Sequence, residues 1–207
     1  MSVSVILAHP NRQSFNHAIA AACVKALDVQ GHEVHFHDLY AERFDSLLPF
    51  EEFGRDAPLP GPIEQHCAEI STASGIIIIH PNWWGQPPAI LKGWVDRIMR
   101  PGVAYQFGEG DSGEGVPKGL LRAQSAVVFN TSNTSEAREQ NVFSDPLESI
   151  WKRCIFGLCG VANVYRRTFG IVVTSSERQR QQWLAEVSRV IEEHYPRMSH
   201  NRVAKGF

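Results

Sequence analysis

The sequence predicts an α/β protein with a doubly wound, five-stranded parallel sheet. Two observations predict this fold class. Short apolar runs alternate with helically spaced apolar residues along the chain, and the run at residues 75–80 is apolar without alternation. Such an unbroken run is typical of a central parallel strand that helices cover on both faces. In this fold class, ligands bind outside the carboxyl ends of the strands.

The first half of the chain supplies three of the expected strands and three helices. In chain order we expect a strand at 3–8, a helix at 14–27, a strand around 34–36, a helix from about 63, a strand at 75–80 and a helix that starts at Pro88. The helix at 14–27 repeats apolar residues every four positions. Proline suits a helix start because its missing N–H costs nothing there. A proline-rich segment at 49–62 is expected to be a surface excursion.

The second half supplies the remaining strands and helices. We expect a strand at 125–130, a helix from Asp145, a strand at 163–173 and a helix from Ser176. Asp145 is a candidate N-cap ahead of Pro146, and Ser176 with Gln179 forms a capping box. Five strands thus alternate with five helices, and we expect a single domain over residues 1–207.

Composition and charge favour small-molecule chemistry. The 207 residues are 43% hydrophobic and 20% charged, and the net charge of -2 gives no global field that would attract nucleic acid or anionic lipid. No apolar run approaches the roughly 20 residues that cross a bilayer. The first strand begins so close to Met1 that no room is left for a signal peptide. We therefore expect a cytoplasmic protein without nucleic-acid partners or membrane insertion.

The loop after the first strand could hold a phosphate. Backbone N–H groups at the start of the next helix favour an anion, Ser14 adds a hydroxyl donor, and Arg12 adds a positive charge. The alternative is an ordinary helix start, with Ser14 as N-cap and no ligand. The loop matches neither the GxGxxG fingerprint nor the Walker phosphate loop, which disfavours a Rossmann dinucleotide site and NTP hydrolysis.

Two further loops would lie at the same edge of the sheet. The loop after the third strand places Trp83 and Trp84 among three prolines, which makes a stiff wall for a flat ligand. Each tryptophan alone is more typical of core packing or of a subunit contact. The loop at 130–134 is a run of small polar residues, which act either as ligand donors or as a polar turn. Three such loops at one edge favour a shared ligand site.

Several stretches carry a family resemblance. They are ILAH at 6–9 with SFN at 14–16, DLY at 38–40, and PAILKGW at 88–94 followed by AY at 104–105. These stretches resemble the NAD(P)H dehydrogenase (quinone) family, which includes quinone reductases and the ancillary oxidoreductases of bacterial potassium-efflux systems. The match spans nearly the whole chain. It implies a flavodoxin-like fold with strand order 2-1-3-4-5.

The resemblance also implies a bound flavin, FMN or FAD, and NAD(P)H as co-substrate. The residues that would contact the phosphate and the ribityl chain are His9, Ser14, Phe15 and Asn16. The backbone of the third-strand loop would line the isoalloxazine ring at Pro81, Asn82, Trp83, Trp84 and Gly85. The backbone of the fourth-strand loop would meet the pyrimidine edge at Thr131, Ser132, Asn133 and Thr134.

A homodimer with the flavin sites at its interface is a further implication. Trp84, Tyr105 and Phe107 would belong to the substrate pocket, the last two by reaching the pocket of the partner, and packing is their alternative role. One departure concerns proton chemistry. Quinone reductases of this type have paired glycines where Ser132 and Asn133 stand, and residues 134–143 lack the family's tyrosine and histidine. No catalytic acid or base is therefore predicted.

We expect a flavin-dependent oxidoreductase in which flavin N5 passes a hydride from NAD(P)H to a quinone or a similar small acceptor. A shared substrate slot predicts ping-pong kinetics. The alternative is a flavin- or nucleotide-binding redox sensor that regulates a membrane transporter, while the near-neutral charge disfavours a one-electron carrier. No metal site is predicted, because His32, His35, His37 and His66 have no further ligands at a metal-site spacing.

Overall fold

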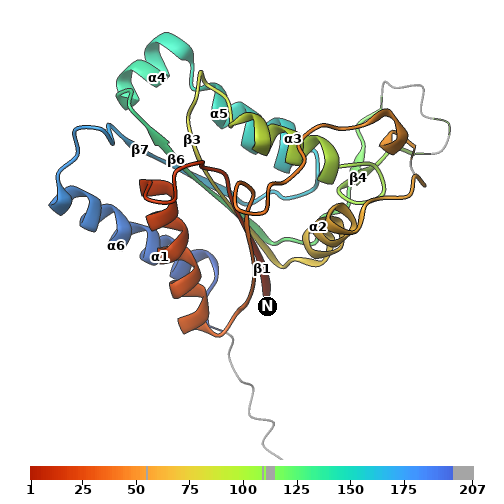
Figure 1. Ribbon diagram of the computed structural model, residues 1–207, viewed down its shortest axis with the longest axis horizontal. Coiled ribbons are helices and arrows are strands. Elements are labelled where there is room, and N and C mark those ends of the chain that lie inside the picture. The colour runs from red at the N-terminus through yellow and green to blue at the C-terminus, as the bar shows by residue number, and fades with distance from the viewer. Residues whose placement is uncertain (55, 109, 111–114, 198–207) are drawn as a thin grey trace, which may run out of the picture.

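A five-stranded parallel sheet forms the centre of the computed structural model, which describes residues 1–54, 56–108, 110 and 115–197 (Figure 1). Its strands are β1 (Ser2–Leu7), β2 (Glu33–Asp38), β3 (Gly75–Pro81), β6 (Ser125–Ser132) and β7 (Val164–Gly170). Their order is β2-β1-β3-β6-β7, and every neighbouring pair is parallel. This is the predicted order 2-1-3-4-5, so the predicted fold class is confirmed.

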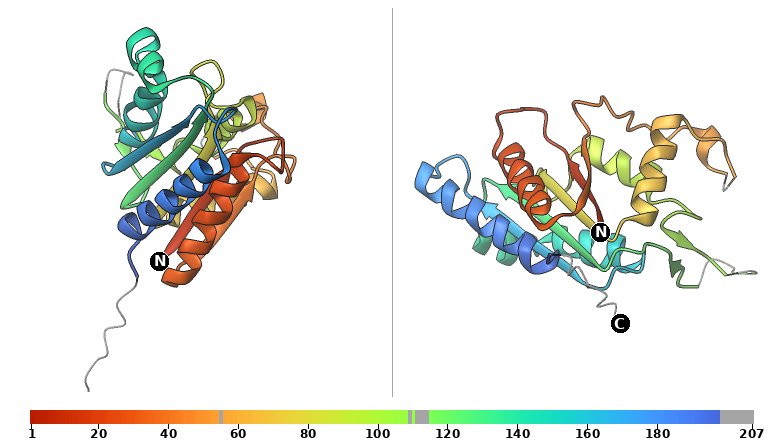
Figure 2. Two further views of the ribbon diagram at one scale, coloured as in Figure 1. Left: turned by 90° about the vertical axis from the view of Figure 1, so that its left-hand side faces the viewer. Right: turned by 90° about the horizontal axis from the view of Figure 1, so that it is seen from below.

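Helices cover both faces of this sheet. On one face α1 (Phe15–Gln30) and α6 (Glu177–His194) lie side by side (Figure 2). The other face carries α2 (Gly61–Thr72), α3 (Ala89–Ile98) and α5 (Pro146–Ser149), which the π-helix η2 (Ile150–Gly157) continues. Alternate residues of a strand face opposite layers, so Ile77 and Ile79 of β3 pack with α1 and α6, and Ile76 and Ile78 pack with α2 and α3. None of the helices in the described part of the chain combines the length and apolar character that crossing a bilayer requires.

Some elements differ from the sequence prediction. The sequence does not predict α4 (Glu136–Phe143), the 3-10 helix η1 (Phe50–Glu52), or the short strands β4 (Tyr105–Gln106) and β5 (Lys118–Gly119), which pair outside the main sheet. In addition, β3 and β6 run further than predicted. Pro81, Thr131 and Ser132 therefore belong to strands instead of loops.

The three expected helix caps have different outcomes. Ser14 and Ser176 cap α1 and α6, because their side chains accept the backbone N–H groups of His17 and Gln179. Asp145 stands at the predicted N-cap position ahead of Pro146, but its backbone is left-handed (φ 42°) and its side chain makes no capping hydrogen bond. The carboxylate forms an ion pair with Arg166 of β7 instead, which ties the start of α5 to the sheet.

Candidate functional site

A cleft of about 500 Å³ opens at the carboxyl edge of the sheet, where β1, β3 and β6 end. Its walls come from segments that are far apart in the sequence. The lining residues are His9, Gln13, Ser14, Phe15, Asn16, Pro81, Asn82, Trp83, Thr131, Ser132, Asn133, Thr134, Val172, Val173 and Arg180. All of the predicted cofactor residues except Arg12, Trp84 and Gly85 therefore lie around one cavity.

The β1–α1 loop forms the first wall. Its turns are fixed by side chains, since the Asn11 Oδ1 atom accepts the Gln13 N–H at 2.9 Å and the His9 Nδ1 atom accepts the Asn11 N–H at 3.1 Å. Burial, with a smaller effect from His17, lowers the pKa of His9. His9 is therefore neutral near pH 7, and because Nδ1 is an acceptor, its Nε2–H is left as a donor.

Asn16 has a buried polar atom without a partner. The side chain is 2% exposed, and its Nδ2 atom donates to the Thr131 Oγ1 atom at 2.8 Å. Among the described residues its Oδ1 atom has no hydrogen-bond partner. A buried unpaired acceptor costs roughly 1–3 kcal/mol. Because Asn16 lines the cleft, a ligand hydroxyl could satisfy this atom, which fits the polyol chain of a flavin.

The tryptophan loop forms a tight turn at the mouth of the cleft. Trp83 and Gln86 exchange backbone hydrogen bonds of 3.1 and 3.0 Å, with Trp84 (φ 57°) and Gly85 (φ 70°) left-handed between them. A Cβ atom on Gly85 would lie 2.7 Å from the ring of Pro146, so this position requires glycine. Trp83 lies beside the ring of His9, with the ring centroids 6.1 Å apart.

Trp84 and Gly85 line an adjoining hollow instead of the main cleft. This hollow is also about 500 Å³ and shares Asn82 and Thr134 with the cleft. The indole of Trp84 is fully exposed, which excludes a role in the core of the described structure. The remaining lining residues are Arg138, Glu139, Phe143 and Pro146. The hollow therefore offers aromatic surface beside the cleft.

A buried polar network supports the floor of the site. The Nδ1 atom of His80 lies 2.8 Å from the carbonyl of Pro81, and its Nε2 atom lies 2.9 Å from Trp151 Nε1 and 2.8 Å from Asn130 Nδ2. Since an indole N–H can only donate, Nε2 is the acceptor and Nδ1 carries the proton. Burial, assisted by the charge of Arg166, lowers the pKa of His80 to about 4. A neutral His80 thus holds the carbonyl at the end of β3 in place.

The predicted phosphate contact Arg12 lies outside the cleft in this structure. It is exposed and does not line the cleft, whereas Arg180 of α6 does. The Arg180 Nε atom donates to Ser175 Oγ at 2.8 Å and its Nη2 atom to the carbonyl of Val172 at 3.2 Å. The sequence contains one signal for this residue. A helix that follows a parallel strand begins at the carboxyl edge, and Arg180 lies in the first turn of α6.

Tyr105 and Phe107 lie away from the cleft. Their rings are 5.7 Å apart and perpendicular, in an apolar groove of about 260 Å³ between α3 and η2. The groove is completed by Val95, Met99, Cys154, Ile155, Leu158 and Cys159. Phe107 is 40% exposed. Within this chain, the two rings therefore do not contribute to the pocket that contains Trp84.

Residues 1–192 match a family described as having a flavodoxin-like fold. The chain belongs to this family. It is 33% identical over 186 residues to a Haemophilus influenzae protein named "Uncharacterized NAD(P)H oxidoreductase", covering 87% of this chain and 89% of that protein.

Solved structures agree with this family assignment. The NAD(P)H:quinone oxidoreductase from Methanothermobacter marburgensis superimposes with a TM-score of 0.77 and 28% identity, over 93% of this chain and 96% of that one. The FMN-dependent NADH-azoreductase from Bacillus anthracis, solved with FMN, has a TM-score of 0.73 over 93% and 99% of the chains. Its 15% identity shows the shared fold alone. The expected resemblance to NAD(P)H dehydrogenase (quinone) proteins is confirmed by the first structure and by the Haemophilus relative.

Helix α4 contains neither the tyrosine nor the histidine that the family resemblance leads us to expect after the fourth central strand. The helix brings Arg138 and Glu139 to the hollow beside the cleft. The buried Glu139 side chain accepts a hydrogen bond of 3.4 Å from Ser132 Oγ, and Ser132 itself lines the cleft. A carboxylate next to the site was not predicted, because α4 was not predicted.

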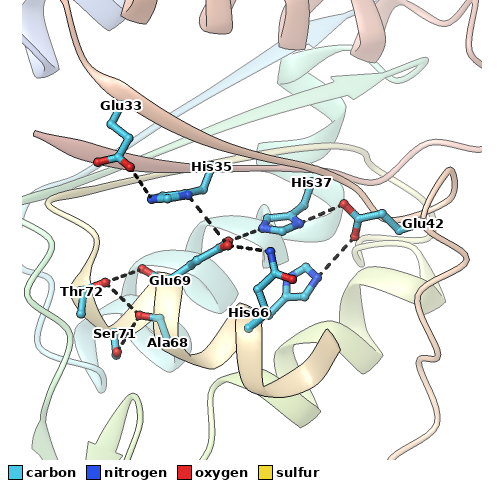
Figure 3. A network of polar contacts seen from close by, with 10 residues as sticks. Glu33, His35, His37, Glu42, His66, Ala68, Glu69, Ser71 and Thr72 are labelled. Carbon is cyan, nitrogen blue, oxygen red and sulfur yellow. Dashed lines mark hydrogen bonds and ion pairs between the residues drawn. The ribbon is translucent and has the colours of Figure 1, made fainter. Parts of the chain in front are cut away.

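A second cluster of ionisable residues lies outside the cleft, between β2 and α2 (Figure 3). The ligand atoms of His37, Glu42 and His66 lie within 4.8 Å of one another, a proximity that the sequence spacing does not reveal. However, the Trp94 Nε1–H donates to His66 Nδ1 at 3.1 Å, so His66 Nε2 carries a proton toward Glu42 at 3.3 Å. A metal ion requires that nitrogen's lone pair. This arrangement therefore favours hydrogen bonds over metal binding.

Proposed function

We propose that this chain is a flavin-dependent oxidoreductase that takes a hydride from NAD(P)H and passes it to a quinone or a similar small acceptor. The observation that carries the proposal is the cleft itself. Three loops with donor and acceptor groups meet there, and the buried Asn16 Oδ1 atom lacks a partner among the described residues. The family relatives named as NAD(P)H oxidoreductases support the same reaction class.

The chain's own residues have distinct roles in this proposal. The N–H groups at the start of α1, with Ser14 and Arg180, hold the phosphate. Asn16 accepts a hydrogen bond from the ribityl chain, and Trp83 with the backbone from Pro81 lines the flat ring. When bound, flavin supplies the two-electron chemistry at N5. The neutral His80 would hold the Pro81 carbonyl at the end of β3, next to the residues that would line the ring.

The hollow beside Trp84 is our candidate for the substrate slot. It adjoins the cleft at Asn82 and Thr134, and it presents Trp84 and Phe143 to planar molecules. We propose that the nicotinamide and the acceptor use this slot in turn. Sequential occupancy gives ping-pong kinetics, and holding each substrate against the ring supplies much of the rate acceleration.

A homodimer is part of the proposal. The apolar groove around Tyr105 and Phe107 would face a second copy, so that the two rings complete the partner's pocket. Light scattering should then give a mass near twice the 23.2 kDa of one chain. Phe107→Asp should shift the protein toward the monomer and raise the KM for the acceptor. A wild-type monomer at micromolar concentration would contradict this part of the proposal.

The function is tested with purified protein, by recording the visible spectrum and identifying any released flavin by mass. We expect a yellow protein, or one that takes up added FMN or FAD, that oxidises NADH or NADPH when a quinone is present. Varying both substrates should give parallel double-reciprocal plots. Protein that binds neither flavin would refute the proposal, and flavin binding without turnover would favour the redox sensor. Intersecting plots would refute the ping-pong mechanism alone.

A further inference from the structure

A relay of three side chains leads away from the phosphate end of the cleft. The Ser14 Oγ atom lies 3.0 Å from His17 Nδ1, and His17 Nε2 lies 3.1 Å from Asp38 Oδ2 at the end of β2. The side chains of His17 and Asp38 are only 18% and 14% exposed. Ser14 lines the cleft, whereas neither His17 nor Asp38 does. The relay therefore connects the cleft to a carboxylate behind it.

Asp38 is held rigidly in the relay. Its Oδ1 atom accepts the backbone N–H groups of Tyr40 and Ala41, both at 3.1 Å. The Oδ2 atom is left to face His17. A fixed carboxylate at hydrogen-bond distance keeps a proton on Nε2 and stabilises a positive charge on the imidazole. The protonation of the other ring nitrogen, His17 Nδ1, then depends on what the Ser14 hydroxyl contacts.

The protonation state of His17 sets the direction of the Ser14 hydroxyl. When the imidazole is neutral, Nδ1 accepts the Ser14 O–H, so that hydrogen is unavailable to a ligand. When the imidazole carries two protons, Nδ1–H donates to Ser14 Oγ and the hydroxyl hydrogen is free to turn into the cleft. A doubly charged anion in the cleft would favour the second state through both its charge and its need for donors.

The surroundings of His17 supply few other charges. Among the described residues its ring contacts are Ser14 in its own helix, Asp38 from β2 and the ring of His9 from the β1–α1 loop, 6.4 Å away. Further along α1, Lys25 and Asp28 line a separate apolar groove that His17 also borders. Burial keeps the pKa of His9 low, so that neighbour adds little positive charge near neutral pH. Asp38 is therefore the main partner of a charged His17.

We propose that Ser14, His17 and Asp38 form a proton-linked receptor for a phosphate monoester, in which His17 takes up a proton when the dianion binds. The inference rests on the proposed flavin site and adds a positioning residue, His17, that acts on the phosphate through Ser14. A monoester such as the end of FMN has a second ionisation near pH 6, whereas each phosphate of FAD has one ester and one anhydride bond and carries only one charge. The relay thus selects FMN over FAD and over riboflavin.

Calorimetric titration of flavin-free protein tests the relay. At pH 7.5, in phosphate-free buffers that differ in ionisation enthalpy, the binding of FMN should show proton uptake, and that of riboflavin should show none. His17→Gln keeps a polar side chain but cannot become a cation. We expect it to abolish the uptake and to weaken FMN roughly tenfold, the effect of losing one charge-assisted interaction. Riboflavin affinity should not change, which also shows that the variant is folded.

Two further variants sharpen the test. Asp38→Asn keeps an oxygen for the N–H groups of Tyr40 and Ala41 and should weaken FMN selectively, as His17→Gln does. His35→Gln, on β2 but directed at Glu33 and Glu69, is the matched control and should leave FMN binding unchanged. An equal loss of FMN and riboflavin affinity in His17→Gln, or an unchanged proton uptake, would overturn the relay. Absence of any flavin binding by the wild-type protein would refute the proposed function itself, and this result is distinct from those that refute only the relay.

Discussion

At the scale of single residues, the chemistry of the cleft depends on polar atoms that the chain leaves available. Asn16 is the clearest case, because its Nδ2 atom is anchored on Thr131 while its Oδ1 atom is buried without a partner among the described residues. Natural proteins rarely bury such an atom unless a ligand or a water molecule satisfies it. Asn16 therefore lowers the stability of the flavin-free protein and provides a hydrogen-bond acceptor when flavin is bound.

Asn16→Ala should separate these two effects. We expect flavin affinity to fall about tenfold, because a ligand hydroxyl loses its acceptor, while the unfolding free energy of flavin-free protein changes by only about 1 kcal/mol. Fluorescence titration and urea denaturation measure the two quantities. Asn141→Ala, at an exposed position of α4, is the control. Equal affinities for Asn16→Ala and wild type would mean that no ligand uses this oxygen.

The sequence predicted the residue types of the cleft but not every contact. Parallel topology alone brings the ends of β1, β3 and β6 to one edge, so Ser14, Trp83 and Asn133 could be grouped from their positions in the chain. Topology brings Arg180 to this edge without showing which atoms it contacts, and it does not show the role of His80. The contact of Arg180 depends on how α6 packs, and the position of His80 depends on Trp151, which is 71 residues away.

At the scale of elements, apolar periodicity determined what could be predicted. The apolar run of β3 and the apolar stripes of α1 and α6 predict these elements clearly, because each element buries its apolar residues in the core. Helix α4 has no such stripe, since Glu139 is its only buried residue. In η2, the i→i+5 winding buries Trp151 and Phe156, whereas Cys154 and the C-cap residue Leu158 are exposed.

The segment between β2 and α2 is held to α3 by a buried ion pair. Arg97 donates through Nε to Glu52 Oε2 at 3.0 Å and through Nη2 to the other carboxylate oxygen, and both side chains are almost fully buried. Gly93 of α3 lies directly under this segment, where a Cβ atom would be 2.0 Å from the carbonyl oxygen of Ser46. The segment is therefore fixed to the helix and packed against it.

Glu52→Gln should destabilise the protein by about 3 kcal/mol, because the buried Arg97 guanidinium would keep only the mostly exposed carboxylate of Asp45, 3.2 Å away, as a counter-charge. Urea denaturation measures this loss. Glu51→Gln, one residue away and exposed, should stay within about 0.5 kcal/mol of wild type. Replacing both partners with apolar residues should recover part of the stability. A loss below about 1 kcal/mol for Glu52→Gln would show that Arg97 finds other partners.

At the scale of the whole molecule, the stability of the fold should depend on pH through two strand histidines, His37 and His80, which face the helical layer of α2 and η2. His37 lies between Glu42 at 2.9 Å and Glu69 at 2.5 Å, in the cluster that joins β2 to α2 (Figure 3). His80 lies at the centre of the sheet with an indole and an amide as donors. The first site favours a charged imidazole and the second a neutral one. Their contributions therefore have opposite signs.

His37 should stabilise the fold on the acid side of its titration. Burial opposes the charge, but hydrogen bonds and charges of Glu42 and Glu69 outweigh it and raise the pKa of His37. The native state thus holds this proton to a higher pH than the unfolded chain does, so the stabilisation is complete below about pH 6.5 and is lost as pH rises through the folded pKa. His37→Gln should cost more unfolding free energy at pH 6 than at pH 9. Equal costs would contradict this assignment.

His80 should act in the opposite direction, and a neutral substitute can isolate its contribution. The unfolded chain binds a proton at this histidine near pH 6.5, whereas the folded chain resists it down to about pH 4. Unfolding free energy should therefore fall by roughly 3 kcal/mol between these values through His80 alone. His80→Gln retains an acceptor for Trp151 and a donor for Pro81 but does not titrate, so the acid limb of its stability curve should be flatter. Urea denaturation from pH 4 to 8 measures the difference, with His35→Gln as control. Parallel stability curves for wild type and His80→Gln would show that His80 is not the residue that resists protonation.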